Sequence, residues 1–215
     1  MRKLTSPSGT TVSYDKVGNG QPLVLVHGSF SDHRSSWEFV TPLFAEHFTV
    51  YAIARRGRGE TDATIDHGVT DEAEDVAALI ESVGEQVYLL GHSYGAQISL
   101  AAATLLPDQT RKLVLYEPPW PHIILKEQME RFEQLAQAAD WEGLATAFFR
   151  DTLAVQGAEI EMLHATEPWN EIVADAEASF RDIRALSKYH FEPESFRKLD
   201  IPVMLQIPFP CSLLS

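Results

Sequence analysis

Short apolar runs alternate with helix-like stretches along the first half of the chain. Continuous apolar runs bounded by turn residues are typical of buried strands, and apolar positions that recur about every three to four residues are typical of amphipathic helices. The runs are residues 22–26, 48–54, 86–90 and 112–116, and the helical stretches are 35–48 (interrupted by Pro42), 71–83 and 97–106. This alternation predicts an α/β fold with a mostly parallel sheet and flanking helices.

Turn and capping residues refine these elements. Residues 10–17 alternate apolar and polar positions, and Gly18-Asn19-Gly20 follows them, so we expect a hairpin between the first strands. Thr70 is the expected N-cap of the helix at 71–83, and Gly84 is expected to end it.

The second half of the chain has a different character. Pro118-Pro119-Trp120-Pro121 ends the alternation, residues 122–199 are helical without a clear strand, and residues 201–207 return to an apolar run. We therefore expect three parts: an α/β core at 1–119, a helical cap at 120–199, and a last core strand with a tail at 200–215.

Composition favours one soluble core. The chain has 215 residues and 45% hydrophobic content, enough for one sizeable core. No run approaches the ~18 apolar residues of a membrane span, and the N-terminus lacks the apolar stretch of a secretion signal, so we expect a cytoplasmic protein without membrane partners. A net charge of −14 opposes binding to nucleic acid. The single cysteine, Cys211, excludes an intrachain disulfide and fits a reducing compartment.

The segment Gly91-His92-Ser93-Tyr94-Gly95 carries the strongest chemical signal. It lies between an apolar run and a helical stretch. A G-x-S-x-G sequence in that setting holds its serine on a sharp turn, with Oγ exposed beside the N-terminus of a helix. Side chains two positions to either side would collide with neighbouring backbone, which requires glycine there. We therefore predict that Ser93 is a nucleophile; the alternative is a turn of small residues without chemistry.

Several segments together resemble a known family. Leu23-Val-Leu-Val-His-Gly-Ser29, Gly91-His-Ser-Tyr-Gly-Ala96 and Leu113-Val-Leu-Tyr-Glu-Pro-Pro119 are similar to motifs of the α/β-hydrolase superfamily, above all its small bacterial esterase, lactonase and haloperoxidase-like members. The resemblance covers most of the predicted core and is loose beyond it. Arg55-Arg-Gly-Arg-Gly-Glu-Thr61 resembles the family's D-x-R-G-x-G-x-S loop, but Ala54 stands where the family usually has Asp, which puts a structural salt bridge there in doubt.

The resemblance also implies an oxyanion hole and a cap. One donor would be the backbone N–H of Tyr94, after the nucleophile, and the other that of Ser29 or the neighbouring Phe30, in the loop after residues 22–26. Large side chains of the cap either line an acyl pocket or pack the cap on itself, as helical stripes usually do. These side chains are Met129, Trp141, Phe148, Phe149, Met162 and Trp169.

The acid and the base of a triad are harder to place. The resemblance implies the chain order serine, acid, histidine, yet no Asp or Glu follows Asp200 and no His follows His190. A further strand, a loop with the histidine and a closing helix are therefore expected to be missing, so the predicted fold is C-terminally truncated unless the triad is assembled in another way. The candidate substitutes are Glu117 as acid and His122 as base. Glu117 is otherwise a solvated or capping carboxylate.

The other histidines carry no metal pattern. His27 and His92 belong to the two motif turns and are expected to brace them, whereas His33 and His67 are expected in surface loops. Because the histidines lack zinc-ligand spacing, neither a metal nor a cofactor is predicted.

Three functional hypotheses follow. The first is a serine hydrolase, an esterase or lactonase, that cleaves a small-molecule carboxylic ester through an acyl-enzyme on Ser93. Serine at this position disfavours dehalogenase and epoxide-hydrolase chemistry, for which the superfamily uses Asp, while perhydrolysis and C–C bond hydrolysis stay open. The second hypothesis is a degenerate, non-catalytic α/β-hydrolase that binds a small apolar ligand. The third is an inert truncated product.

The end of the chain predicts self-association. Without a further strand, residues 202–207 form a sheet edge with unpaired backbone groups, and such edges pair with other chains. The tail at 209–214 is apolar, but Pro208 and Pro210 make it a poor strand, so packing across the sheet face is expected instead. We therefore expect a homodimer whose interface includes residues after Ile201.

Overall fold

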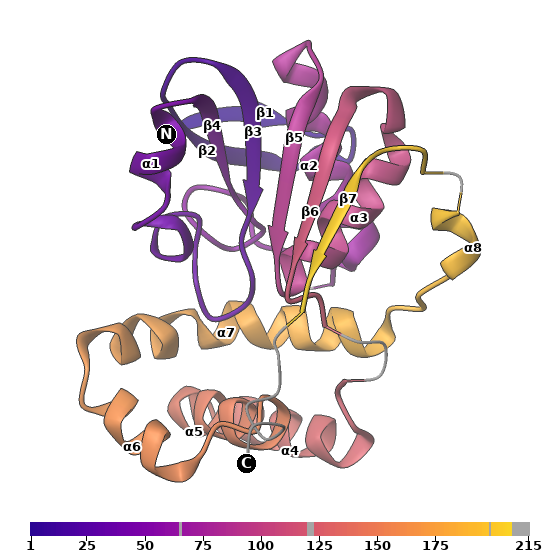
Figure 1. The fold of residues 1–215 in the computed structure, drawn as a ribbon. Coiled ribbons are helices and arrows are strands. Elements are labelled where there is room, and N and C mark those ends of the chain that lie inside the picture. The colour runs from indigo at the N-terminus through magenta and orange to yellow at the C-terminus, as the bar shows by residue number, and fades with distance from the viewer. Residues whose placement is uncertain (65, 120–122, 198, 208–215) are drawn as a thin grey trace, which may run out of the picture.

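Seven strands form one sheet, with helices against its faces and a helical layer across one end (Figure 1). The computed structural model describes residues 1–64, 66–119, 123–197 and 199–207. The strand order is β1-β2-β4-β3-β5-β6-β7. The strands are β1 (Arg2–Thr5), β2 (Thr11–Val17), β3 (Gln21–Val26), β4 (Phe48–Ala54), β5 (Val87–His92), β6 (Thr110–Tyr116) and β7 (Val203–Gln206). The α/β-hydrolase fold with a mostly parallel sheet is confirmed.

One predicted strand pairing is wrong. The strands from β4 to β7 in the sheet order pair in parallel, but β2 is antiparallel to both β1 and β4. β4 therefore lies between β2 and β3. The first strands do form a hairpin, but it joins β1 to β2 through residues 6–10 and not across Gly18-Asn19-Gly20. The physical reason is that five of the six residues of β3 are buried, which favours a place inside the sheet, covered on both faces, over one arm of a hairpin at its edge.

The helices fall into two groups along the chain. The first group flanks the sheet, and the second forms the layer at its end except for its last helix, α8, which lies beside the sheet near β7 (Figure 1). The first group comprises the 3₁₀ turn η1 (Ser35–Trp37), α1 (Thr41–Ala45), α2 (Val69–Val83), α3 (Tyr94–Leu105) and the 3₁₀ turn η2 (Pro107–Gln109). The second comprises α4 (Lys126–Gln137), α5 (Trp141–Ala147), the π-helical turn η3 (Phe148–Thr152), α6 (Gly157–His164), α7 (Glu167–Lys188) and α8 (Pro193–Phe196).

Two helix ends differ from the predicted ones. α2 begins at Val69 rather than after Thr70, because Val69 is buried, and Gly68 is the N-cap, its N–H donating to Asp71 Oδ2 at 2.7 Å. Gly84 ends α2 with a φ of 78°, as predicted. The helix expected over residues 35–48 is reduced to η1 and α1, and Pro42 lies in the first turn of α1, where its missing N–H is not needed.

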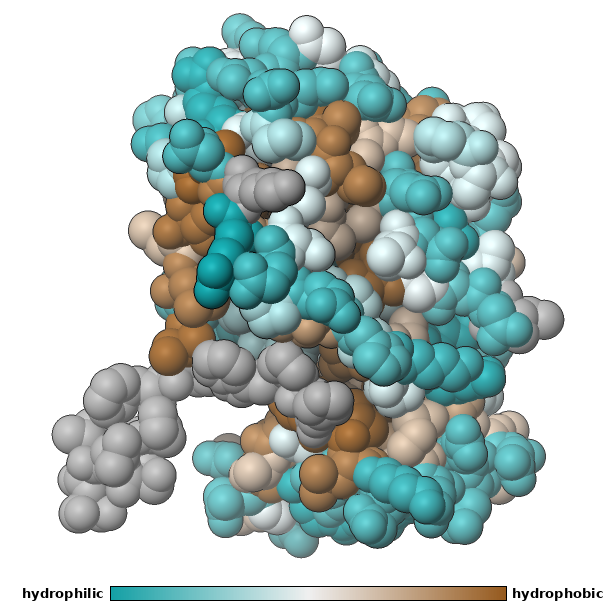
Figure 2. Space-filling model, turned by 90° about the vertical axis from the view of Figure 1, so that its right-hand side faces the viewer, coloured by the Kyte–Doolittle hydropathy of each residue, from teal (hydrophilic) through white to brown (hydrophobic). Residues whose placement is uncertain are grey.

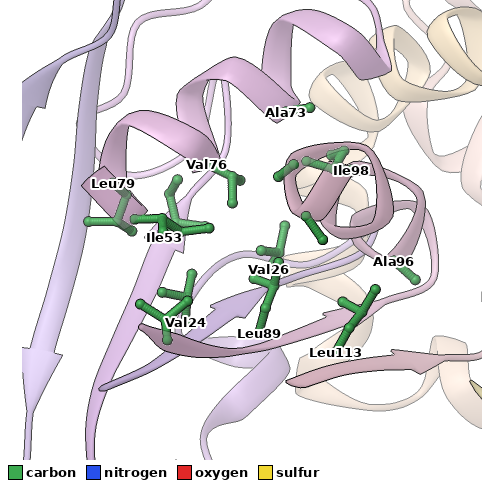
Figure 3. Packing of buried hydrophobic residues seen from close by; sticks show 14 of the residues in the cluster. Val24, Val26, Ile53, Ala73, Val76, Leu79, Leu89, Ala96, Ile98 and Leu113 are labelled. Carbon is green, nitrogen blue, oxygen red and sulfur yellow. The ribbon is translucent and has the colours of Figure 1, made fainter. Parts of the chain in front are cut away.

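The main core lies between the sheet and helices α2 and α3 (Figure 3). Figure 3 shows aliphatic side chains of the strands facing those of the two helices; among them are Val24, Val26, Ile53, Leu89 and Leu113 from strands, Ala73, Val76 and Leu79 from α2, and Ala96 and Ile98 from α3. A smaller cluster on the other face joins β3 and β4 to Trp37. The parallel strands are covered on both faces, and their carboxyl ends lie together at one edge of the sheet. The candidate site lies at this edge.

α7 crosses below the carboxyl ends of the parallel strands, and α4, α5 and α6 lie beyond it (Figure 1). These helices share an apolar cluster that includes Phe132 and Leu144 and also takes in Phe30, from the loop after β3. Most of the side chains considered for an acyl pocket pack in or against this cluster: Met129, Trp141, Phe148, Phe149 and Trp169. Met162 is 73% exposed. Packing of the helices on themselves therefore accounts for most of this set.

In the described part of the chain, β7 is one of the two edges of the sheet, opposite β1. All four of its residues are exposed, including Met204 at 60% and Leu205 at 54%. Figure 2 views the molecule from the side on which β7 lies and shows apolar side chains at the surface between hydrophilic ones. The tail at 209–214 and Cys211 lie outside the described residues. Among the described helices, none combines the length and the apolar character needed to cross a bilayer.

Candidate active site

Ser93 has a strained backbone at the junction of β5 and α3. Its φ is 51° and its ψ is −125°, a region that costs a non-glycine residue on the order of 1–3 kcal/mol. The Ser93 N–H donates to the carbonyl oxygen of Tyr116 at 2.8 Å, which ties the turn to the end of β6. The serine is thus held at the carboxyl edge of the sheet, directly before the N-terminus of α3, where partial positive charge favours an anion.

The glycines around Ser93 are required by close backbone packing. A Cβ on Gly91 would overlap the carbonyl oxygen of Gly95 and the hydroxyl of Ser99. A Cβ on Gly95 would overlap the carbonyl oxygens of Val26 and His27, at the end of β3. The elbow is therefore pressed against the loop after β3, as the G-x-S-x-G spacing predicted.

The loop after β3 lies beside the serine. A Cβ on Gly28 would come within 2.9 Å of Ser93 Cβ, so Gly28 packs directly against the predicted nucleophile. Phe30 has a φ of 57°, and its N–H donates to the hydroxyl of Ser179 in α7. In the described part of the chain, neither the Ser29 N–H nor the Tyr94 N–H has a hydrogen-bond partner. Of the three predicted donors, only the Phe30 N–H has a hydrogen-bond partner, and those of Ser29 and Tyr94 have none among the described residues.

Arg55 contacts both the loop after β3 and the start of α3. Its Nε donates to the carbonyl oxygen of His27 at 2.9 Å and its Nη2 to that of Gly28 at 2.9 Å. The guanidinium also lies over the ring of Tyr94, with Cζ 4.8 Å from the ring centroid. A single buried cation therefore contacts the loop after β3 and the first residue of α3 at once.

The carboxylate partners of Arg55 come from two distant helices. Arg55 Nη1 donates to Glu72 Oε2 of α2 at 3.0 Å, and Nη2 to Asp182 Oδ2 of α7 at 2.6 Å. The salt bridge placed in doubt by Ala54 is thus supplied from elsewhere in the fold. Burial alone would raise the pKa of Asp182, but the positive charges of Arg55 and Arg58 outweigh burial and hold that pKa well below its ordinary value.

Asp182 and Ser179 are site-adjacent residues that the sequence did not reveal. Asp182 Oδ2 accepts a hydrogen bond from Ser29 Oγ at 2.8 Å, and both α7 residues are fully buried. Along the sequence they are one polar pair among many in an amphipathic helix. Ser179 and Asp182 are three positions apart in the sequence, which places both on one face of α7. The neighbouring residues do not show that this face is buried.

His27 braces the loop, as predicted. Its side chain is fully buried, Nδ1 donates to the carbonyl oxygen of Gly28 at 2.8 Å, and Nε2 accepts from the Arg55 N–H at 3.3 Å. The hydrogen bond that Nε2 accepts requires the neutral ring, with the proton on Nδ1. Burial lowers the pKa of His27 well below its ordinary value, and the charge of Arg55 acts in the same direction.

Glu117 lies at the same sheet edge as Ser93. It follows β6 with a φ of 50°, and its Oε2 is 3.8 Å from His92 Nε2. The His92 ring stacks on Tyr116, with 5.0 Å between centroids. Burial lowers the pKa of His92, and the charge of Glu117 opposes this only in part. The predicted base, His122, lies outside the described residues, and among the imidazoles that the structure describes none is hydrogen-bonded to Ser93 Oγ.

Two histidines expected at the surface are buried. His33 is 3% exposed, and the His67 side chain is 1% exposed, with Nε2 3.3 Å from Glu72 Oε1. His67, Glu72 and Asp182 are grouped closely enough for a metal, with potential ligand atoms within 4.8 Å of one another. Arg55 already donates to both carboxylates, so its cation takes the place that a metal ion would need. Sequence reasoning missed His67 because it lies in a turn-rich stretch without apolar periodicity.

A cavity of about 780 Å³ opens beside the loop after β3, between that loop, β2, β4 and α7. Ser31, Arg58 and Asp175 are among its lining residues, but Ser93 is not. The cavity therefore borders the residues that support the candidate site and not Ser93.

Comparison with known proteins defines the class. The model of the alpha/beta hydrolase family matches residues 23–207, and the chain belongs to this family. Human epoxide hydrolase 4 is 28% identical over 137 residues, which cover 61% of this chain and 38% of that protein. N-formylmaleamate deformylase of Pseudomonas putida is 34% identical over 105 residues, which cover 47% of this chain and 39% of the relative. The chain thus matches less than half the length of these two relatives.

Among solved structures, an alpha/beta hydrolase from Sphaerobacter thermophilus superimposes with a TM-score of 0.84 and 26% identity, covering 95% of this chain and 80% of that chain. The resemblance drawn from the motifs is confirmed by the family match and by this structural similarity.

Proposed function

We propose that this chain is the acyl-transfer unit of a serine hydrolase that cleaves carboxylic esters or lactones through an acyl-enzyme on Ser93. The observation that carries the proposal is the strained Ser93, with φ 51° and ψ −125°, next to the two free N–H groups of Ser29 and Tyr94. A nucleophile and two convergent donors are the parts that acyl transfer needs.

The chemistry has two stages. Ser93 Oγ adds to the acyl carbon while its proton passes to a base, and the carbonyl oxygen becomes an oxyanion that accepts hydrogen bonds from the Ser29 and Tyr94 amides. The C–O bond to the alcohol then breaks, the alkoxide takes the proton from the base, and an ester on Ser93 remains. Water, activated by the same base, hydrolyses this ester and restores the serine.

The base and the acid of this scheme are His122 and Glu117 in our proposal. The position of Glu117 supports this proposal. Glu117 directly follows β6, whose last residue, Tyr116, accepts the hydrogen bond from the Ser93 N–H. The imidazole that the structure places near Glu117 is that of His92, at 3.8 Å, so Glu117 has an imidazole partner whichever histidine serves as base.

The relatives suggest which substrates to compare. One relative is a deformylase of N-formylmaleamate, so an N-formyl amide belongs in the assay beside short-chain esters and lactones. Another is an epoxide hydrolase, but a serine at the elbow supports acyl transfer instead, because the superfamily's epoxide chemistry uses Asp at that position. Since no described imidazole is bonded to Ser93 Oγ, a binding protein without turnover is the second candidate function.

Covalent labelling separates these candidates. We expect a fluorophosphonate to label the wild-type chain and p-nitrophenyl butyrate to give a burst of p-nitrophenol, both lost in Ser93→Ala. Ser82→Ala is the matched control, because Ser82 is exposed on α2 and its hydroxyl bonds only the carbonyl oxygen of Leu79.

Labelling that survives in Ser93→Ala would contradict the proposal. Turnover alone is a weaker criterion, because an oxyanion hole and substrate binding without a triad still accelerate hydrolysis by about 10³–10⁴ over water. Thermal stabilisation by an apolar ester, in a wild-type chain that is never labelled, would support the binding protein instead.

A further inference from the structure

α7 binds two consecutive residues of the loop after β3, which carries the candidate oxyanion donor Ser29. The Phe30 N–H donates to Ser179 Oγ, and Ser29 Oγ donates to Asp182 Oδ2 at 2.8 Å. Ser179 and Asp182 are three positions apart, so they lie on one face of the helix. That face is turned to the loop, and both residues are fully buried. One helix, remote in sequence, therefore contacts both candidate donors of the loop.

The two contacts belong to one buried network. Arg58 Nη2 donates to Ser179 Oγ at 3.1 Å and to Asp182 Oδ2 at 2.9 Å, and Ser179 Oγ donates to Asp175 Oδ2 at 2.6 Å. Arg55 joins Asp182 to the carbonyl oxygens of the same loop. The side-chain oxygens that contact the loop, Ser179 Oγ and Asp182 Oδ2, are thus each hydrogen-bonded to charged partners as well.

The geometry at Phe30 decides which amide is left for a substrate. With a φ of 57°, Phe30 is in a conformation that a bulky residue adopts only when its surroundings impose it. Its N–H is directed to α7, and its ring packs on Phe148 at 4.8 Å between centroids. The preceding N–H, that of Ser29, follows Gly28, which packs against Ser93, and it lacks a partner among the described residues.

We propose that Ser179 and Asp182 are positioning residues that set the oxyanion hole from the helical layer. Ser179 retains the Phe30 amide, and Asp182 anchors the Ser29 side chain, so that the Ser29 amide faces the acyl oxygen together with that of Tyr94. This inference rests on the proposed acyl transfer at Ser93. It means that the helical layer completes the catalytic machinery and is more than a cover for it.

The test uses variants that remove one hydroxyl each, because loss of the Asp182 carboxylate would leave buried arginine charge unpaired and destabilise the protein. Ser179→Ala removes the acceptor of the Phe30 amide, and Ser29→Ala removes the anchor to Asp182 while keeping the Ser29 amide. Ser187→Ala is the matched control: it removes a hydroxyl of the same helix that is exposed and bonds only the Arg184 carbonyl oxygen.

Two readouts are measured on the whole chain. By NMR-detected hydrogen exchange, we expect the Phe30 amide to exchange at least about tenfold faster in Ser179→Ala than in the wild type, and unchanged in Ser187→Ala. In ester turnover, we expect Ser179→Ala and Ser29→Ala each to lower kcat by about ten- to a hundredfold with KM within about threefold, because a displaced donor weakens binding of the transition state more than of the substrate. Ser187→Ala should retain both kcat and KM.

The outcomes separate this inference from the proposed function. A labelled, active wild type whose kcat is unchanged in Ser179→Ala and Ser29→Ala would overturn the positioning role alone. Unchanged exchange of the Phe30 amide in Ser179→Ala would do the same. A rise in KM with kcat preserved would show that α7 only shapes substrate binding, which also contradicts the inference. A wild type that the fluorophosphonate never labels would overturn the proposed function and this inference with it.

Discussion

At the scale of single residues, the unusual feature is a negative charge with no access to water. Asp182 is 0% exposed, and its carboxylate accepts hydrogen bonds from Arg55, Arg58 and Ser29. Such a carboxylate contributes to stability only in its ionised form, because two buried guanidinium groups depend on it. Its removal is therefore expected to cost more than a surface ion pair, whose worth is about 0–1 kcal/mol.

We expect Asp182→Asn to lower the free energy of unfolding at pH 7 by about 3–5 kcal/mol, since it leaves buried arginine charge uncompensated. Urea denaturation measures this. The control is Glu177→Gln, which removes a charge of the same helix that is exposed and pairs with Arg181; a change within about 0.5 kcal/mol is expected there. Equal stability of Asp182→Asn and wild type would contradict the ionic role of Asp182.

The same residue predicts a pH dependence with a definite sign. Because the folded-state pKa of Asp182 is lowered, the stability it contributes is complete above the unfolded pKa, about 4, and is lost as pH falls toward the folded pKa. The difference in unfolding free energy between wild type and Asp182→Asn should thus stay constant, within experimental error, from about pH 5 to 7. Below about pH 4 this difference should become smaller. A gap that widens in acid would contradict this.

At the scale of elements, helix ends depend on single backbone conformations. Gly84 closes α2 with a φ of 78°, and nothing lies within 4 Å of a Cβ built on it. Gly157 opens α6 in equally open space but without a positive φ. The two positions therefore separate the cost of a left-handed backbone from the cost of crowding.

We expect Gly84→Ala to lower the free energy of unfolding by about 1 kcal/mol, because the left-handed conformation disfavours a side chain. Gly157→Ala should leave stability unchanged or raise it by less than about 1 kcal/mol, since alanine is the better helix former. Chemical denaturation of both variants measures the difference. A loss in Gly157→Ala as large as in Gly84→Ala would show that backbone conformation is not the cause.

At the scale of the whole molecule, the sheet has one conspicuous edge. β7 pairs with β6 on one side, and its apolar residues are exposed, Val203 at 46% and Ile207 near its end at 53%. Exposed apolar edges favour pairing with another chain. We propose that two copies of this chain associate through β7.

Light scattering at micromolar concentration is expected to show a homodimer for the wild type and a monomer for Leu205→Asp. Leu205 is 54% exposed on β7, and a charge there disfavours pairing of the edge. The control is Leu43→Asp, at a leucine that is 62% exposed. Its helix, α1, packs on β4, which β3, β5 and β6 separate from β7. A monomeric wild type would contradict self-association.

The sequence alone determined the features that depend on neighbouring residues. The apolar run at 48–54 became β4, Gly84 ended α2, and the glycines at 91 and 95 marked a turn that has no room for side chains. These follow from side-chain periodicity and backbone sterics over a few residues, which any short segment carries in itself. The family and its fold could be read from them.

Only the tertiary structure decided what depends on contacts between distant residues. β4 lies between β2 and β3 because a strand that is apolar on both faces requires the sheet's interior. His67 is buried against Glu72, and Asp182 bonds Arg55 across 127 positions of the chain. No local pattern distinguishes a carboxylate that meets a buried guanidinium from one that meets water, because burial is a property of the folded assembly. For the same reason, only the fold shows that the Phe30 N–H donates to Ser179 of a helix remote in sequence, whereas the Ser29 N–H has no partner among the described residues.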